Sequence, residues 1–217
     1  MKKQTKNNFF AAVGLLASFV LWTVAVRFVD VRAIGPRNSS VGFATVNGFF
    51  HNLTGVNMTL YTVTDWLGLV PIAVCFGFAM LGLAQWIKRK RLLKVDHSIR
   101  MLGMFYLAVM AVYILFEYVV VNRRPVLIDG YLEASYPSST TLLVLCVMPT
   151  ALMQLNSRIK NDFFRRMVAV GIVLFILFMV IGRLISGVHW LTDIVGGALL
   201  SAGLVMIYRT IISFARG

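Results

Sequence analysis

Residues 167–185 read MVAVGIVLFILFMVIGRLI, an apolar run whose single charged side chain is Arg183. The hydrocarbon core of a bilayer is roughly 30 Å thick and needs about 20 apolar residues in a helix that crosses it. This run therefore predicts a transmembrane helix. The whole chain of 217 residues has the same character, because 59% of it is hydrophobic and only 13% is charged. That composition excludes a water-soluble domain with an ordinary polar surface.

Five other apolar runs are long enough to be spans, although Pro149 interrupts the shortest of them. The six expected spans are Phe9–Val29, Leu67–Ile87, Met101–Val121, Thr141–Leu155, Met167–Ile185 and Trp190–Phe214. The fold class that follows is all-α, a polytopic membrane protein built as a bundle of six transmembrane helices. The length allows one domain over residues 1–217 and no separate soluble module.

The segment between the first two spans also contains a helical pattern. Its apolar residues recur at spacings of three and four, at Phe43, Val46, Phe49, Phe50 and Leu53. This spacing predicts an amphipathic helix, either lying in the membrane interface or capping the bundle as a short helix.

The net charge of +13 comes from 21 basic and 8 acidic residues, and their distribution predicts the topology. The side that holds both termini carries Lys2, Lys3, Lys6, Lys88, Arg89, Lys90, Arg91, Lys94, Arg100, Arg158, Lys160, Arg165, Arg166, Arg209 and Arg216. The other side carries Arg27, Arg32, Arg37, Arg123, Arg124 and Arg183, balanced by as many acids. Basic residues accumulate in cytoplasmic loops, so we expect both termini to be cytoplasmic. The excess charge is a topological signal and does not indicate nucleic acid as a partner.

The strongest chemical signal is the run GRLISGVHWLTD at residues 182–193. His189 and Asp193 are four residues apart, so the carboxylate can accept the proton of one imidazole nitrogen and leave the other free to attack. Arg183 offers a planar fork of donors suited to phosphate oxygens. The alternative is structural: Asp193 and His189 satisfy each other at a helix start, and Arg183 is an interfacial anchor.

A second element is Asn122-Arg123-Arg124-Pro125, at the outer end of the third span. The proline predicts the end of the helix nearby, which leaves two guanidinium groups at the outer surface. They suit an anionic ligand, although paired arginines at a membrane boundary also serve as anchors to lipid headgroups.

A third element lies at the start of the fourth span, where Ser138, Ser139 and Thr140 follow Pro137. A helix that begins with hydroxyl residues presents free N–H groups and a positive dipole end, both suited to an anion. On its own the same pattern is also typical of an ordinary helix N-cap.

Together the three elements resemble the type 2 phosphatidic acid phosphatase family of integral membrane lipid phosphatases. That family has three blocks in order: Lys, six residues, Arg-Pro; then Pro-Ser-Gly-His; then Ser-Arg, five residues, His, three residues, Asp. The matches here are Arg124-Pro125, Pro137-Ser138, Arg183, His189 and Asp193. The resemblance implies that His189 forms a phosphohistidine, that Asp193 assists it, and that the phosphate is bound by Arg124, Arg183 and the Ser138–Thr140 segment. It implies no cofactor and no metal, and a membrane lipid phosphate as the partner molecule.

The sequence departs from the family blocks at Glu117, Ser139, Thr140 and Gly182, where the family has Lys, Gly, His and Ser. The His that Thr140 replaces is the family's general acid, and such an acid typically contributes about 10²- to 10⁴-fold. A phosphate monoester leaving from a diphosphate needs an acid less than an alkoxide does. We therefore expect a polyprenyl diphosphate, such as the undecaprenyl carrier, to be dephosphorylated on the outer face of a bacterial cell membrane.

Glu117 lies seven residues before Arg124, about two helical turns, and has two interpretations. It could hold Arg124 by an ion pair, with Arg123 as a further auxiliary residue, or it could be a buried acid that replaces the missing proton donor. Two other functions also remain open from the sequence. One is a catalytically impaired relative that binds phospholipid or a lipid-linked partner, and the other is a lipid phosphotransferase on the same scaffold.

Overall fold

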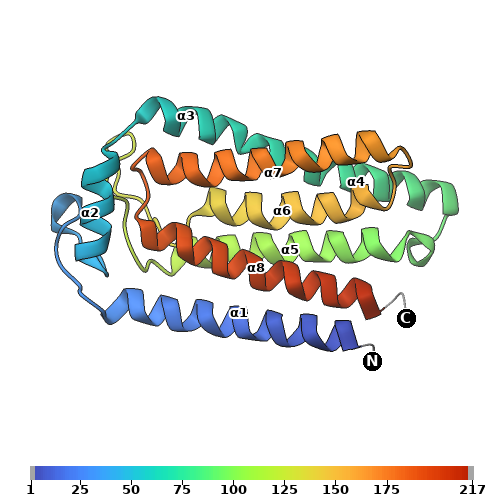
Figure 1. Ribbon diagram of the computed structural model, residues 1–217, viewed down its shortest axis with the longest axis horizontal. Coiled ribbons are helices and arrows are strands. Elements are labelled where there is room, and N and C mark those ends of the chain that lie inside the picture. The colour runs from blue at the N-terminus through green and yellow to red at the C-terminus, as the bar shows by residue number, and fades with distance from the viewer. Residues whose placement is uncertain (1–2, 215–217) are drawn as a thin grey trace.

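The computed structural model describes residues 3–214, which form eight α-helices and two short 3₁₀ turns (Figure 1). The helices are α1 (Lys3–Phe28), α2 (Ala44–Thr54), α3 (Met58–Leu67), α4 (Leu69–Arg89), α5 (His97–Tyr118), α6 (Ser139–Asn156), α7 (Asp162–Ile185) and α8 (Leu191–Phe214). The 3₁₀ turns are η1 (Pro36–Asn38) and η2 (Leu92–Lys94). The expected all-α class is confirmed.

Six helical stretches of the described chain are long and apolar enough to cross a membrane, which confirms the predicted number of spans. Five of them match the expected runs within a few residues. The second is longer than expected, because α3 and α4 meet at Gly68 and together cover Met58–Arg89. Asp65 and several threonines interrupt the apolar run in α3, so the sequence did not predict this extension. The helix begins after Asn57, which caps it by accepting a hydrogen bond from Leu60 N at 2.9 Å.

The predicted amphipathic helix is present as α2, which lies across one end of the bundle in Figure 1. Its Val46, Phe49 and Leu53 side chains are exposed. Its opposite face packs on the bundle, where the buried Asn47 amide donates a hydrogen bond to Thr192 Oγ1 at 2.9 Å. The helix therefore caps the bundle with one face and presents an apolar surface with the other.

The start of α1 and the end of α8 lie at the end of the bundle opposite α2 (Figure 1). The predicted topology also puts the two termini on one side. Lys2 and Arg216, which belong to the basic set of that side, lie outside the described residues. The segments 119–138 and 186–190 lie at the other end, where they bring the three sequence elements together.

The centre of the bundle is α8, which packs against α1, α5, α6 and α7. Small residues allow this close approach. A Cβ atom added to Gly203 would lie 2.7 Å from the Leu16 side chain of α1, and one added to Gly196 would lie 2.5 Å from the Tyr136 ring. The Tyr136 contact fixes the chain just before the start of α6, and so helps to position the functional site.

Candidate active site

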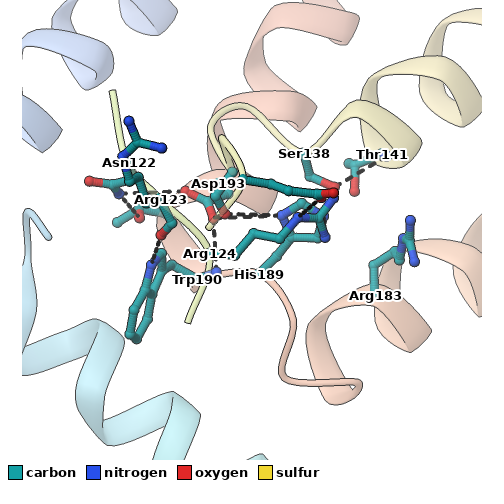
Figure 2. Close-up of polar contacts among 12 residues, drawn as sticks. Asn122, Arg123, Arg124, Ser138, Thr141, Arg183, His189, Trp190 and Asp193 are labelled. Carbon is teal, nitrogen blue, oxygen red and sulfur yellow. Dashed lines mark hydrogen bonds and ion pairs between the residues drawn. The ribbon is translucent and has the colours of Figure 1, made fainter. Parts of the chain in front are cut away.

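The turn between α7 and α8 places His189 at the end of the bundle where α2 lies. Gly187 has φ +68°, and a Cβ atom there would lie 1.9 Å from the carbonyl oxygen of Gly55. Glycine is the residue that adopts this conformation and tolerates this contact without strain. The tight turn directs His189 inward, where its side chain is buried beside Arg124 and Asp193 (Figure 2).

His189 contacts its carboxylate partner through a serine that the sequence blocks do not include. Its Nδ1 atom lies 3.7 Å from Asp193 Oδ2 but 3.2 Å from Ser135 Oγ, and Ser135 donates a hydrogen bond to Asp193 Oδ2. Because the single hydroxyl proton of Ser135 is given to Asp193, the serine oxygen accepts from Nδ1–H of His189. The arrangement leaves the lone pair on Nε2, which lies 3.5 Å from Arg124 Nη1.

The Asp193 carboxylate is buried and held by several donors. Besides Ser135, Oδ2 accepts a hydrogen bond from Trp190 N at 2.9 Å, while Oδ1 lies 3.5 Å from the Asn122 amide nitrogen. The bond to Trp190 N closes the first turn of α8 in the manner of a capping box. Trp190 Nε1 in turn donates to Arg123 O at 2.7 Å, which fastens the 122–124 segment to the start of α8 (Figure 2).

The electrostatic environment keeps His189 neutral. Burial is the largest effect and lowers the pKa of His189 to about 4; Asp193 opposes this shift, and the nearby Arg124 and Arg183 add to it. Removing an imidazolium from water is costly, and the two guanidinium groups repel it further. A neutral imidazole with an unprotonated Nε2 is the form required of a nucleophile.

Arg183 lies at the end of α7 and is 2% exposed, so its charge has to be paired. Its Nη2 atom donates to Asp65 Oδ1 at 3.0 Å and to Thr140 Oγ1 at 2.6 Å. The guanidinium carbon lies 4.9 Å from the centre of the Tyr61 ring, and that of Arg124 lies 6.0 Å from the same ring. Both guanidinium groups thus lie within cation–π distance of the Tyr61 ring, and both line the same pocket.

Arg124 forms its ion pair with Glu133, whose Oε2 atom lies 3.0 Å from Nε. Within the described residues Arg124 forms no ion pair with Glu117, so the hypothesis that Glu117 holds Arg124 is wrong. Glu133 comes from the loop before α6, nine residues beyond Arg124, where helical spacing gives no signal. The burial on which an acid role for Glu117 depended is also missing, because its side chain is exposed at the wall of the pocket.

The start of α6 divides the three hydroxyl residues by role. Ser138 is fully buried and is the N-cap, with its hydroxyl facing Thr141 N at 3.5 Å (Figure 2). Its backbone N–H donates to Asp193 O at 3.1 Å, so Ser138 joins α6 to α8 and does not reach the pocket. Ser139 and Thr140 do line the pocket, and Thr140 is bound by Arg183.

These side chains surround a pocket of about 470 Å³. Of the predicted site residues, those that line it are Glu117, Arg123, Arg124, Ser139, Thr140, Arg183 and His189, whereas Asp193 and Ser138 support it from behind. Sequence reasoning missed Asp65 and Ser135 and assigned no role to Glu133. Ser135 was detectable only by its place three residues before Ser138, and Asp65 and Glu133 only as acids near the ends of spans.

A second, apolar cavity of about 890 Å³ adjoins the pocket and runs between α4 and α5. Both cavities are lined by Asp65, Tyr113, Ser139, Thr140 and Leu142, which mark their junction. From there the groove follows α4 from Leu69 to Trp86, a distance of about 26 Å at 1.5 Å per residue. A polar pocket thus opens into an apolar groove that is longer than one leaflet of a bilayer core.

Within residues 3–214 no group of three or more His, Cys, Asp or Glu side chains is placed to hold a metal ion. The charged and imidazole side chains that line the pocket are Arg123, Arg124, Arg183, His189, Asp65, Glu117 and Glu133.

Comparisons with known proteins found one similar solved structure and one matching family model, whereas no curated protein matches the chain significantly. The fold is similar to that of a solved structure described as the first transmembrane PAP2 type phosphatidylglycerolphosphate phosphatase from Bacillus subtilis, with a TM-score of 0.62 and 15% identity over 94% of this chain and 97% of that one. The family model of the PAP2 superfamily matches residues 107–216, which contain His189, Asp193 and both buried arginines. The chain therefore belongs to the PAP2 superfamily.

Proposed function

We propose that this protein is a membrane lipid phosphatase in which Nε2 of His189 attacks the terminal phosphorus of a lipid diphosphate. The observation that carries the proposal is the combination of a neutral, buried histidine with two converging guanidinium groups, in a pocket that opens into an apolar groove. The pocket suits a phosphate, and the groove suits the chain attached to it.

The proposed reaction is a double displacement. His189 Nε2 forms a bond to phosphorus as the bond to the bridging oxygen breaks, and Nδ1–H continues to donate to Ser135 Oγ, whose own proton is donated to Asp193. Arg124 and Arg183 neutralise the charge on the equatorial oxygens, with N–H groups of the Ser139–Thr140 turn as further donors. Water then hydrolyses the phosphohistidine and releases inorganic phosphate.

Two observations support a diphosphate with a long tail. Thr140 can donate a hydrogen bond to the bridging oxygen, since its own oxygen already accepts from Arg183, but it cannot deliver a full proton as a histidine would. A diphosphate provides a leaving group that does not need one. The groove, at about 26 Å, exceeds the roughly 15 Å of one leaflet, and this length favours a polyprenyl chain such as undecaprenyl over a diacylglycerol.

The topology belongs to the same proposal. The termini, with most of the basic residues, face the cytoplasm, and the pocket opens at the extracytoplasmic face of a bacterial cell membrane. The exposed face of α2 then lies in the outer interface of that membrane.

The experiment is phosphate release by the purified protein in detergent, with undecaprenyl diphosphate and phosphatidic acid compared at equal surface concentration. We expect faster turnover of the diphosphate and none by His189→Ala. Faster turnover of phosphatidic acid would refute the substrate class. Phosphate release that persists in His189→Ala, with both proteins equally folded by thermal unfolding, would refute the mechanism.

A further inference from the structure

Hydrolysis of a phosphohistidine needs a proton acceptor for the attacking water, and within residues 3–214 no histidine besides His189 lines the pocket. The water has to approach phosphorus from the side opposite Nε2, which is the side the leaving group has vacated. Because the lipid tail lies in the groove, the leaving group departs through the junction between pocket and groove. The proton acceptor should therefore lie at that junction.

Five residues line both cavities, and one of them carries a carboxylate. Asp65 is that residue, whereas the others offer hydroxyls or an apolar side chain. Glu117 and Glu133 line the pocket but not the groove. Position alone thus separates Asp65 from the two other acids of the site.

The contacts of Asp65 place it beside the phosphate site. Its Oδ1 atom and Thr140 Oγ1 both accept from Nη2 of Arg183, at 3.0 and 2.6 Å, so the two oxygens are no more than about 5.6 Å apart. One water molecule can bridge two oxygens at that separation. The Asp65 side chain is 57% exposed and also lines the polar pocket, so the protein does not enclose the carboxylate.

We propose that Asp65 is the general base of the second step, an inference that rests on the proposed function. A water molecule bound at the junction attacks the phosphorus of phosphorylated His189. The new O–P bond forms as the P–Nε2 bond breaks and returns its electron pair to Nε2, and the water proton passes to the Asp65 carboxylate. Asp65 then loses that proton to solvent as phosphate leaves.

Asp65→Asn tests this role, because the amide oxygen can still accept from Arg183 while the basicity is lost. Rapid-quench assays with diphosphate labelled at the terminal phosphorus would follow lipid monophosphate release and alkali-stable label on His189. We expect one equivalent of lipid product in a normal burst, accumulation of phosphohistidine, and a steady-state rate lower by about 10²- to 10⁴-fold. Glu117→Gln is the matched carboxylate variant and should not accumulate label.

Asp65→Ala should respond to added formate, a small base that can occupy the vacated space, with faster loss of label. A burst that is itself suppressed in Asp65→Asn would show that the residue only positions Arg183 and would overturn the proposal. Loss of label at the wild-type rate would overturn it too. Wild-type protein that releases no phosphate and carries no label would refute the proposed function itself, and this role with it.

Discussion

The Ser135 hydroxyl lies 3.2 Å from Nδ1 of His189. The carboxylate of Asp193 is farther from the same nitrogen, at 3.7 Å, and receives the serine proton instead. The orientation of the imidazole and the position of its proton thus depend on a hydroxyl as well as on the carboxylate that the sequence motif indicates. Ser135 comes from the loop before α6, so three chain segments together set the tautomer of one histidine.

Ser135→Ala should lower kcat by about 10- to 100-fold, because a hydrogen bond to a charged group contributes about 1.5–3 kcal/mol. The Asp193 carboxylate would also lose a buried donor, so the unfolding temperature should fall. Steady-state phosphate release and thermal unfolding would measure the two effects. Ser201→Ala is the matched control, since Ser201 is also buried and does not line the pocket, and its hydroxyl bonds Gly197 O within α8 and the backbone oxygen of Leu142. Equal kcat values in the two variants would contradict the role of Ser135.

The low pKa of His189 predicts a pH-dependent stability. An unfolded histidine titrates near 6.5, whereas the native pKa is about 4, so between these values the unfolded state binds a proton that the native state does not. Stability should therefore fall as pH is lowered from about 6.5 to about 4, by on the order of 3 kcal/mol from this residue.

Thermal unfolding of wild type and His189→Gln in the same detergent would isolate that contribution. His51, whose pKa is also lowered by burial, is present in both proteins and cancels in the comparison. The wild type should lose more of its unfolding temperature between pH 7 and pH 4.5 than the variant does. Parallel losses would show that His189 is not held neutral by the fold.

Much of the fold follows from the sequence, because the bilayer allows few ways to arrange long apolar runs. Apolar length gave the six spans, and spacing gave α2. The predicted start of the second span was wrong because the charge of Asp65 makes the sequence of α3 resemble that of a loop. In the structure, this aspartate forms an ion pair with Arg183 from another helix. A pairing of that kind is a property of tertiary packing and leaves no periodic trace.

The site was predictable where spacing carries the chemistry. His189 and Asp193 are one helical turn apart, and Arg183 precedes them at a fixed distance. The partners that lie on other segments were not predictable in this way. Arg124 forms its ion pair with Glu133 and not with Glu117 because the loop of residues 122–135 folds back on itself. In this loop Arg124 N donates a hydrogen bond to Glu133 O at 3.1 Å.

Glu117→Gln should accordingly leave turnover within about twofold of wild type and the pH profile unchanged. The side chain is exposed at the pocket wall, and Arg124 keeps its ion pair with Glu133 in the variant. Glu117 forms no ion pair with the part of the chain that the structure describes, and an exposed carboxylate of this kind contributes little to stability or positioning. Phosphate release across pH 5–9 is the measurement. A loss of more than tenfold, with a shifted basic limb, would restore the acid role.

The length of the groove predicts a substrate-dependent effect of filling it. Gly103 lines the groove on α5, ten residues or about 15 Å from Tyr113 at the junction, and no atom lies within 4 Å of a Cβ added there. A phenylalanine at this position should fit the backbone and occupy the groove beyond the reach of a tail that fills only one leaflet. Gly103→Phe should therefore raise KM for undecaprenyl diphosphate by about tenfold or more and spare a substrate with a short prenyl tail.

Gly77→Phe is the matched control, because Gly77 on α4 is equally free of close neighbours but does not line the groove. Turnover of both substrates should be unchanged in this variant. If Gly103→Phe impaired the short and the long substrate alike, the effect would come from a distorted bundle, which thermal unfolding would reveal. If it impaired neither, the tail would have to leave the protein before the inner half of the groove, and the argument from groove length for a polyprenyl chain would fail.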